Sequence, residues 1–480
     1  MFYPPIRQQD QQPASTVARI LFALGLSFIV LTMTLSRAAA NPVADLKPGH
    51  WYEVPGSHLR DVAPDPAAYK EIQGIGGVKA VMDNWSGGAY DSHRQRLIVW
   101  GGGHRGYAGN EIYAFDVNAL KWERLTEPSP VKGYDGKSPA LPDGNPVSRH
   151  TYNNLVYLPP PYDALWVQGG SRWWDGNGDK ATWMFDFEEK AWRRLADVEQ
   201  SYFLNYSAYD PVEKKIWHHP NQYLKSYDPQ TDQWAGYGRK KGLWGGRSNA
   251  IDPKRRQLVI IGHNKVLAYD LTGADGFRQR TLDTTGATEI LKAHSPGFVY
   301  DPVSDRLVAW GGGPEVYTLN LDTLVWERHP PAPGNRVLPT EPSSRGTYGR
   351  FQYVPAYNAF ILVNAVDENV YFYKLNAKAG VAAGRPTAGA YIRRTGDYFK
   401  TPGEAAKAAI DGDVVEILTG AYHAEAAVWT QSNLTLRGVG GRAQLLAAGN
   451  AVQGKGIWVI RGDNVTVENV EFSGAGAGIW

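Results

Sequence analysis

One pattern of short apolar runs occurs at two distant places in the sequence. The first copy covers Tyr90–Leu125 and the second covers Tyr300–Arg328. Both copies hold a Tyr-Asp pair, an apolar run that ends in Trp-Gly-Gly-Gly, a run that ends in Asp or Asn, and a Trp-Glu-Arg segment. Short runs that are rich in β-branched and aromatic residues, with Gly, Asn or Asp at their ends, are typical of antiparallel strands. Self-similarity at such a distance predicts an architecture assembled from one repeated unit.

Residues 41–376 contain six copies of this unit, and we expect each copy to form one four-stranded sheet. The second strand of each copy carries an apolar run: Leu97–Trp100, Leu165–Gln168, Ile216–His219, Leu258–Ile261, Leu307–Trp310 and Phe360–Val363. The fourth strands of the first five copies carry an aromatic residue: Trp122, Trp192, Trp234, Phe277 and Trp326.

The sixth copy lacks a fourth strand of its own. It stops at Tyr371–Leu375 without the expected tryptophan, whereas Trp51–Val54 near the start of the chain belongs to no copy. An open array would leave two unpaired sheet edges, and closing the array into a ring protects them. The sequence therefore predicts that Trp51–Val54 completes the last sheet.

The unit resembles the kelch repeat. The resemblance rests on the Tyr/Phe-Asp ending of the third strand, the spaced tryptophans, and paired glycines after the second strand, at Gly101-Gly102, Gly169-Gly170 and Gly311-Gly312. It implies a six-bladed, galactose-oxidase-like β-propeller for residues 41–376. Galactose oxidase itself needs a cysteine crosslinked to a tyrosine at its copper centre, and this sequence has no Cys. Copper-radical oxidase chemistry is therefore excluded.

A different pattern begins after a predicted linker at residues 377–390. Thr401-Pro402-Gly403-Glu404 is a capping box with proline at the first helical position, which predicts a short helix. Very short strands separated by Gly and Asn follow it. The segment Asp411–Tyr422 resembles the start of a right-handed parallel β-helix of the pectate-lyase-like type, in which this helix would cap the solenoid. Because the chain ends at Trp480 inside a coil, we expect residues 391–480 to form an incomplete β-helix within an all-β protein.

The first 40 residues have the features of a signal peptide. Arg7 and Arg19 precede an apolar run at Ile20–Leu35, and Ala38-Ala39-Ala40 provides a cleavage site. We expect export to the periplasm, the cell surface or the medium; the alternative is a single N-terminal membrane anchor. No other apolar run is long enough to span a bilayer, so the mature chain should have no membrane span.

Charge argues against nucleic acid as a partner. The whole chain carries a formal charge of +2, and residues 1–40 contain three Arg and one Asp, so the mature chain is neutral. A neutral chain gains nothing from counterion release on a phosphate backbone.

A repeated signature suggests where a ligand binds. Ser148–Tyr152 matches Ser344–Tyr348, which places Arg149 and Arg345 at the same position of two blades. Long loops at Glu127–Val147 and Pro330–Ser343 are expected on the same face of the propeller. Two guanidiniums at the mouth of the central channel would suit a carboxylate-bearing ligand such as a uronic or sialic acid. The alternative is that both arginines brace the loops of the repeat.

The loop at Ser171–Asp179 adds aromatic candidates. Arg172, Trp173 and Trp174 lie among polar residues there, and exposed indole rings can stack on sugar rings. Alternatively, both tryptophans pack on a neighbouring blade. His150 and His104 complete the predicted ligand-binding set.

Metal binding is not expected, and neither is any cofactor. The Asp-x-Asn-x-Asp sequence at 175–179 lacks the glycine and the closing glutamate of a calcium loop. The spacing of His104, His218, His219 and His263 matches no known metal motif.

These features favour an exported carbohydrate-binding protein whose propeller face recognises an acidic sugar or polysaccharide. Two alternatives stay open, because fold alone does not give function. One is a polysaccharide lyase or uronate epimerase that acts through the β-helix, and the other is a surface module for protein–protein interaction. No catalytic residue can be assigned from the sequence.

Overall fold

The computed structural model describes residues 41–200, 202–243, 245–375, 389–395, 397–447 and 456–474. The predicted signal peptide and most of the predicted linker lie outside the described residues. Within these ranges no helix is both long and apolar enough to cross a membrane.

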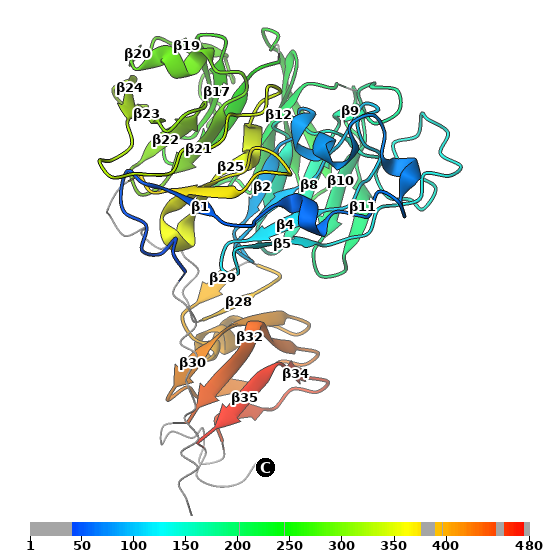
Figure 1. The fold of residues 1–480 in the computed structure, drawn as a ribbon. Coiled ribbons are helices and arrows are strands. Elements are labelled where there is room, and N and C mark those ends of the chain that lie inside the picture. Colours follow the sequence, from blue (N-terminus) through cyan, green and yellow to red (C-terminus); the bar gives the residue numbers. More distant parts are fainter. Residues whose placement is uncertain are drawn as a thin grey trace, which may run out of the picture. The chain divides into compact units, whose positions relative to one another are not determined.

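Six four-stranded antiparallel blades form the first part of the chain (Figure 1). Blades 1 to 3, from the inner strand outward, are β2 (Gly88–Asp91), β3 (Arg96–Val99), β4 (Tyr113–Asp116), β5 (Lys121–Arg124); β7 (Leu155–Leu158), β8 (Ala164–Gln168), β10 (Thr182–Asp186), β11 (Ala191–Leu195); and β12 (Asn205–Asp210), β13 (Lys215–Pro220), β14 (Tyr223–Asp228), β15 (Gln233–Arg239). Blades 4 to 6 are β16 (Ser248–Asp252), β17 (Gln257–Gly262), β18 (Lys265–Asp270), β19 (Arg280–Leu282); β21 (Gly297–Asp301), β22 (Arg306–Trp310), β23 (Val316–Asn320), β24 (Val325–His329); and β25 (Phe351–Val354), β26 (Ala359–Leu362), β27 (Val370–Tyr373), β1 (Trp51–Val54).

Smaller elements decorate the blades. Strand β20 (Thr285–Gly286) pairs in parallel with β24 as a fifth strand of blade 5. Strands β6 (Arg149–His150) and β9 (Ser171–Arg172) form a separate two-stranded ladder. The helix α1 (Ala80–Asp83) precedes blade 1, and short 3-10 turns lie at Leu59–Val62, Lys70–Ile72, Gly77–Lys79, Thr288–Lys292, Tyr348–Arg350 and Pro355–Tyr357.

The predicted ring closure is confirmed. Strand β1 is antiparallel to β27, with Trp51 opposite Tyr373 and Val54 opposite Val370. The inner strands also contact one another around a full circle, from β2 through β7, β12, β16, β21 and β25 back to β2. The protein thus contains a closed six-bladed β-propeller. Its inner strands line a central cavity of about 230 Å³.

The repeated Asp at the end of the third strand has a local structural reason. In blade 1 the Oδ1 atom of Asp116 accepts hydrogen bonds from the backbone N–H groups of Asn118 and Ala119, each at 2.8 Å. In blade 2, Asp186 receives the same pair of bonds from Glu188 and Glu189. Such side-chain caps fix the turn into the fourth strand.

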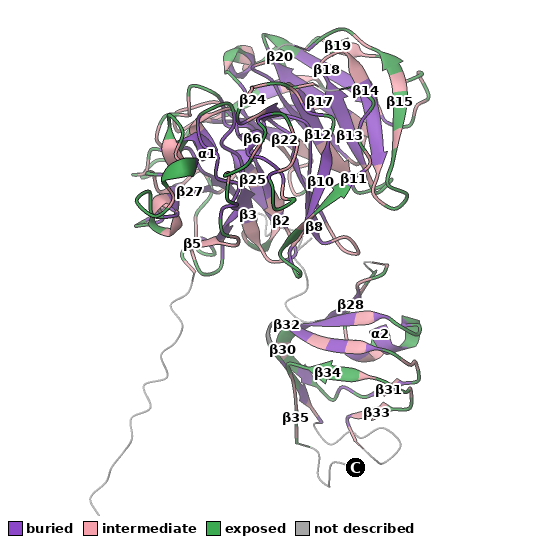
Figure 2. Cartoon of the chain, turned by 90° about the vertical axis from the view of Figure 1, so that its right-hand side faces the viewer, coloured by how far each residue is buried: buried purple, intermediate pink, exposed green. Residues whose placement is uncertain are grey.

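The apolar runs of the second strands are buried from both sides (Figure 2). Between blades 1 and 2, for example, Ile98 of β3 and Trp100, which directly follows that strand, join one core cluster with Leu165 and Val167 of β8. Because each sheet packs against a neighbour on both faces, these strands are apolar without the alternation of a half-exposed strand.

The C-terminal residues form parallel strand pairs and one helix. The helix α2 (Pro402–Ala408) forms as predicted, and Thr401 caps it by accepting a hydrogen bond from Glu404 N at 3.2 Å. The strands are β28 (Ala390–Ile392), β29 (Asp397–Phe399), β30 (Val414–His423), β31 (Ala427–Trp429), β32 (Thr435–Leu446), β33 (Trp458–Ile460), β34 (Thr466–Glu468) and β35 (Val470–Ser473). β30 pairs with β32, β31 with β33, and β32 with both β34 and β35, all in parallel.

Candidate functional site

The segments that lead into the blades carry four bulky or polar residues in a left-handed backbone conformation. Trp85, Tyr152, Ser295 and Tyr348 have φ values of +47°, +47°, +46° and +50°. Side chains other than glycine rarely adopt this region, and each such residue costs about 1–3 kcal/mol unless its surroundings hold it there. Backbone hydrogen bonds between neighbouring blades do so: Tyr152 N donates to Trp85 O at 2.6 Å, and Tyr348 N donates to Ser295 O at 3.1 Å. Strain of this kind concentrates at functional sites.

Four side chains from blades 1, 2 and 6 follow one another at the end of the propeller where these segments enter the blades. The Arg345 guanidinium lies 4.2 Å from the centre of the Trp85 ring. The Trp85 ring is 4.9 Å from that of His150, which in turn is 6.3 Å from that of His104. We call Arg345, Trp85, His150 and His104 the mouth cluster. Below it, the rings of Tyr152 and Tyr348 meet edge to face at 6.3 Å.

The electrostatic environment of the mouth cluster favours an anion. Burial, together with charge repulsion from the neighbouring His104 and Arg345, lowers the pKa of His150 to about 3. Partial burial, together with His263 and Arg345, also lowers the pKa of His294. The charged neighbours of both imidazoles are therefore basic groups. A bound carboxylate would relieve this repulsion.

Arg149 does not share this environment, although its signature matches that of Arg345. Its side chain is 0% exposed, and its Nη1 donates to Asp179 Oδ2 at 2.9 Å and to Gly169 O at 3.0 Å. Nε donates to Val147 O at 3.0 Å. The two guanidiniums expected to converge on a ligand are thus in different places, since Arg345 is exposed and Arg149 braces the loops.

Two other arginines play the same structural role as Arg149, each in another blade. Arg247 Nη1 donates to Gly262 O at 2.7 Å, and Arg350 Nη1 donates to Val363 O at 2.9 Å. In each of these blades the accepting carbonyl lies at the end of the second strand: Gly262 is the last residue of β17, and Val363 directly follows β26, as Gly169 follows β8 in blade 2. Blades 2, 4 and 6 therefore carry one buried bracing arginine each.

The tryptophan loop contributes one exposed ring. Trp173 is 7% exposed and packs 6.2 Å from Tyr134, whereas Trp174 is 49% exposed with the Arg105 guanidinium 5.6 Å from its ring. Arg172 pairs with Asp175 at 2.6 Å. Of the three predicted residues in this loop, only Trp174 has a largely exposed aromatic ring.

This loop is continuous with the mouth cluster. The His104 ring lies so close to Gly176 that a β-carbon at that position would lie 2.7 Å from His104 Nε2. Gly176 has a φ of +69°, which a glycine adopts without strain. The contacts therefore run from Arg345 through Trp85, His150 and His104 to the loop that presents Trp174.

His218 and His219, the other histidines considered as metal ligands besides His104 and His263, are separate from this surface. His218 and His219 are fully buried in blade 3, where His218 Nδ1 lies 2.7 Å from Ser207 Oγ and His219 Nε2 lies 2.6 Å from Tyr269 Oη. Over the described ranges, no three His, Asp or Glu side chains are grouped as metal ligands would be.

Sequence reasoning missed Trp85 and Arg105. Neither residue lies in the repeated signature, because both belong to segments that join the strands. One signal was present: an aromatic residue stands shortly before the inner strand at Trp85, Tyr152 and Tyr348, and all three have a positive φ.

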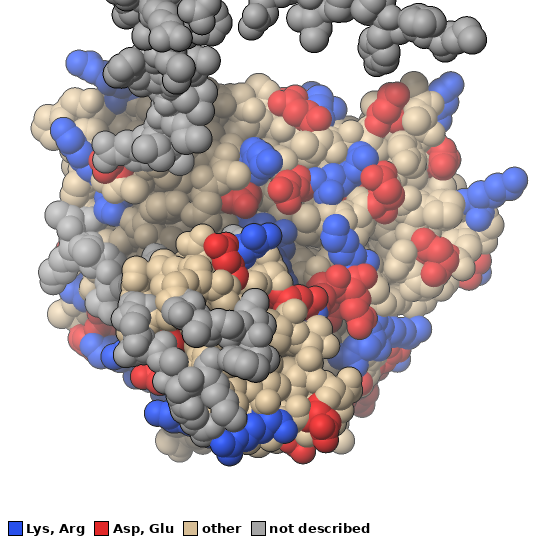
Figure 3. Space-filling model, turned by 90° about the horizontal axis from the view of Figure 1, so that it is seen from below, with Lys and Arg blue, Asp and Glu red and all other residues tan. Residues whose placement is uncertain are grey.

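Charge on the outer surface is mixed on the face seen in Figure 3. Lys and Arg side chains are interspersed there with Asp and Glu. Mixed charge creates no extended field of one sign on that face. No protein-family model matches this sequence, and no curated protein is significantly similar to it.

Proposed function

We propose that the protein is an exported carbohydrate-binding protein, and that the mouth cluster binds a sugar that carries a carboxylate. One observation carries the proposal: Arg345 is exposed, stacks on Trp85, and forms no ion pair with any acidic group in the described ranges. An exposed guanidinium held by stacking keeps its donors free for a carboxylate, which it can bind through two parallel hydrogen bonds.

The neighbours of Arg345 suit the rest of a sugar. The Trp174 ring, which is 49% exposed, is an apolar surface on which the C–H face of a pyranose can pack. His104 and the neutral His150 can exchange hydrogen bonds with hydroxyl groups. The cluster holds no carboxylate that could act as a general base, so the proposed role is binding.

Two family assignments accompany this proposal. The glycine pairs, capped turns and ring of six blades support a kelch-type propeller. The C-terminal strands support the first coils of a right-handed β-helix, with α2 over its end. There Thr435 pairs with Thr466 and Ala427 with Trp458 at the same 31-residue spacing. A side-chain bond at that spacing joins Asn464 Nδ2 to Asn433 Oδ1 at 2.9 Å.

The test compares an acidic oligosaccharide with its neutral form. Calorimetric titration of the full chain with oligogalacturonate and with its methyl ester separates the carboxylate from the ring. We expect the acid to bind and the ester to bind much more weakly. Arg345→Ala should weaken binding of the acid at least about ten-fold, as expected for loss of a charged hydrogen bond.

Arg336→Ala is the matched control. Arg336 is an exposed arginine in the same loop and does not belong to the mouth cluster. Its neighbour Asn335 bonds to the outer strand of blade 6, through Trp51 N at 2.9 Å. The proposal fails if both alanine variants bind the acid equally, or if the ester binds as well as the acid. A sialylated oligosaccharide as a second ligand would identify which acidic sugar is preferred.

A further inference from the structure

Three of the five tryptophans in the outermost strands share a bonding pattern, whereas Trp192 and the buried Trp326 do not. The three donate the indole N–H to a backbone carbonyl that belongs to the preceding blade or directly follows it. Trp51 donates to Pro314 O at 2.9 Å, Trp122 to Ser57 O at 2.9 Å, and Trp234 to Ala196 O at 3.0 Å. Each bond fastens the rim of one blade to its neighbour.

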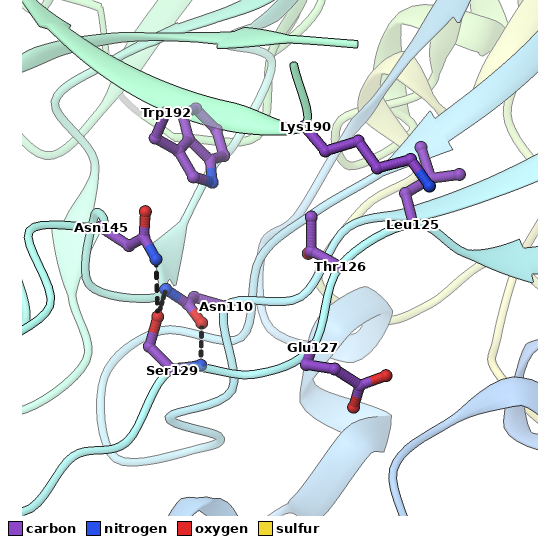
Figure 4. Close-up of a pocket in the computed structure, with 8 residues that line it drawn as sticks. All are labelled: Asn110, Leu125, Thr126, Glu127, Ser129, Asn145, Lys190 and Trp192. Atoms are coloured by element: carbon purple, nitrogen blue, oxygen red, sulfur yellow. Dashed lines mark hydrogen bonds between the residues drawn. The ribbon is translucent and has the colours of Figure 1, made fainter. Parts of the chain in front are cut away.

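Trp192 of blade 2 has no such bond. Its carbonyl partner would come from the segment after β5, the outer strand of blade 1. In that place the structure has a pocket of about 270 Å³, lined by Trp192 and by the following residues: Asn110, Leu125, Thr126, Glu127, Ser129, Asn145 and Lys190. Figure 4 shows the indole nitrogen on the edge of the ring that points into this space. No described residue accepts a hydrogen bond from it.

The floor of the pocket is a fixed polar network. Asn110 Nδ2 donates to Ser129 Oγ at 3.0 Å, and Ser129 N donates back to Asn110 Oδ1 at 2.8 Å. Asn145 Nδ2 donates to the same Ser129 Oγ at 3.1 Å and to Asp143 Oδ2 at 3.0 Å. These bonds settle the orientation of the Asn145 amide, and its Oδ1 points toward Trp192 (Figure 4). That oxygen accepts no hydrogen bond within the described part of the chain.

The pocket therefore presents one unused donor and one unused acceptor, from Trp192 and Asn145. Hydroxyl groups match both, because a hydroxyl can accept from an indole N–H and can donate to an amide oxygen. Thr126 Oγ1 already accepts from Ile112 N at 3.0 Å, which leaves its own O–H as a further donor.

Charge at the rim is balanced. Lys190 is exposed, and Glu127 pairs with Arg124 at 2.9 Å with its own side chain 62% exposed. Opposite charges at the rim give no preference for a charged ligand. The volume lies near the lower limit of about 300 Å³ for small-molecule sites, which fits one sugar ring rather than a chain.

We propose that this rim pocket between blades 1 and 2 binds the hydroxyl groups of a single neutral sugar residue. The site is separate from the mouth cluster and shares no residue with it. It does not depend on the proposed acidic ligand, since its recognition elements are an indole N–H, an amide oxygen and a hydroxyl.

The test observes the indole N–H directly. Full-length protein labelled with ¹⁵N-tryptophan is titrated with the methyl glycosides of glucose, galactose and mannose. Trp192→Phe identifies the Trp192 signal by its loss. We expect at least one glycoside to shift that signal in a saturable way. Asn145→Ala, which removes the acceptor, should weaken the affinity at least about five-fold.

Trp122→Phe is the matched control, because Trp122 occupies the equivalent position of blade 1 but already donates its indole N–H to Ser57 O. It should leave the titration of Trp192 unchanged. The proposal is overturned if none of the three glycosides shifts the Trp192 signal up to its solubility limit. It is equally overturned if Asn145→Ala binds as tightly as the parent protein. Neither result bears on oligogalacturonate binding at the mouth cluster.

Discussion

Arg149 and Asp179 form an ion pair that is closed off from solvent. Nη1 of the arginine lies 2.9 Å from Oδ2 of the aspartate, and the two side chains are 0% and 5% exposed. Burial alone would disfavour the charged guanidinium and lowers its pKa; Asp179 counters this effect. The pair and the backbone carbonyls around it hold together the loops of blade 2.

Arg149→Ala should therefore destabilise the fold rather than alter a ligand site. Removal of one partner leaves the other charge buried and unpaired, which costs about 3–5 kcal/mol. Arg345→Ala should change the free energy of unfolding by less than about 0.5 kcal/mol, because the side chain is exposed. Urea unfolding of both variants checks this, and equal midpoints would contradict the assignment of a bracing role to Arg149.

The contrast between these two arginines shows where sequence reasoning stops. Ser148–Tyr152 and Ser344–Tyr348 are nearly the same sequence, yet the buried arginine of blade 6 is Arg350 and not Arg345. Which side chain reaches the carbonyl after the second strand depends on the path of the preceding loop in three dimensions. A local motif does not contain that information.

Ring closure could be predicted because it follows from counting. The sixth copy of the repeat lacked a fourth strand, and Trp51–Val54 belonged to no copy. The simplest solution was to pair the Trp51 strand with the last strand of the sixth copy, β27. The Asp-capped turns and the helix at Pro402 were also local features, set by hydrogen bonds between residues close in sequence. Trp85 was missed because its role comes from contacts with His150 and Arg345, which are distant in the chain.

Trp51→Ala should open the ring at blade 6. Trp51 is 3% exposed, its ring lies 4.9 Å from that of Tyr373, and its indole N–H bonds to Pro314 O. Loss of so large a buried side chain costs about 3–5 kcal/mol. Amide hydrogen exchange should accelerate most in β27, whose outer edge loses its partner. Trp51→Phe, which keeps the aromatic packing, should show a smaller change; equal exchange in β27 and β4 would argue against closure through β1.

Stability should fall as the pH drops below about 6.5. Burial lowers the pKa of His219 to about 3 and holds the pKa of His218 well below its usual value. Both imidazoles stay neutral in the folded protein, whereas the unfolded chain binds protons once the pH passes below about 6.5. Protonation of each of these histidines in the unfolded chain therefore lowers the free energy of unfolding by about 2 kcal/mol between pH 6.5 and pH 5.

His219→Gln should reduce this pH dependence by about the same 2 kcal/mol. The measurement is the difference between the free energies of unfolding at pH 7 and pH 5, from urea titrations of variant and parent. Tyr269→Phe is the control, because it removes the hydrogen-bond partner of His219 and retains the titrating ring. That variant should be less stable at both pH values with the slope of the parent. An unchanged slope in His219→Gln would show that His219 is not the titrating group.

Trp174→Ala should affect long ligands only. Trp174 is 49% exposed, so its removal should leave the free energy of unfolding nearly unchanged. Along the surface, His150 and His104 lie between Trp85 and the loop that carries Trp174. A ligand bound at Arg345 must therefore extend across both histidines to reach Trp174. Loss of one aromatic contact weakens binding about 3–10-fold, which corresponds to about 0.5–1.5 kcal/mol. Calorimetry should show this loss for oligogalacturonate and none for methyl galacturonide; an equal loss for both would place Trp174 at the carboxylate site itself.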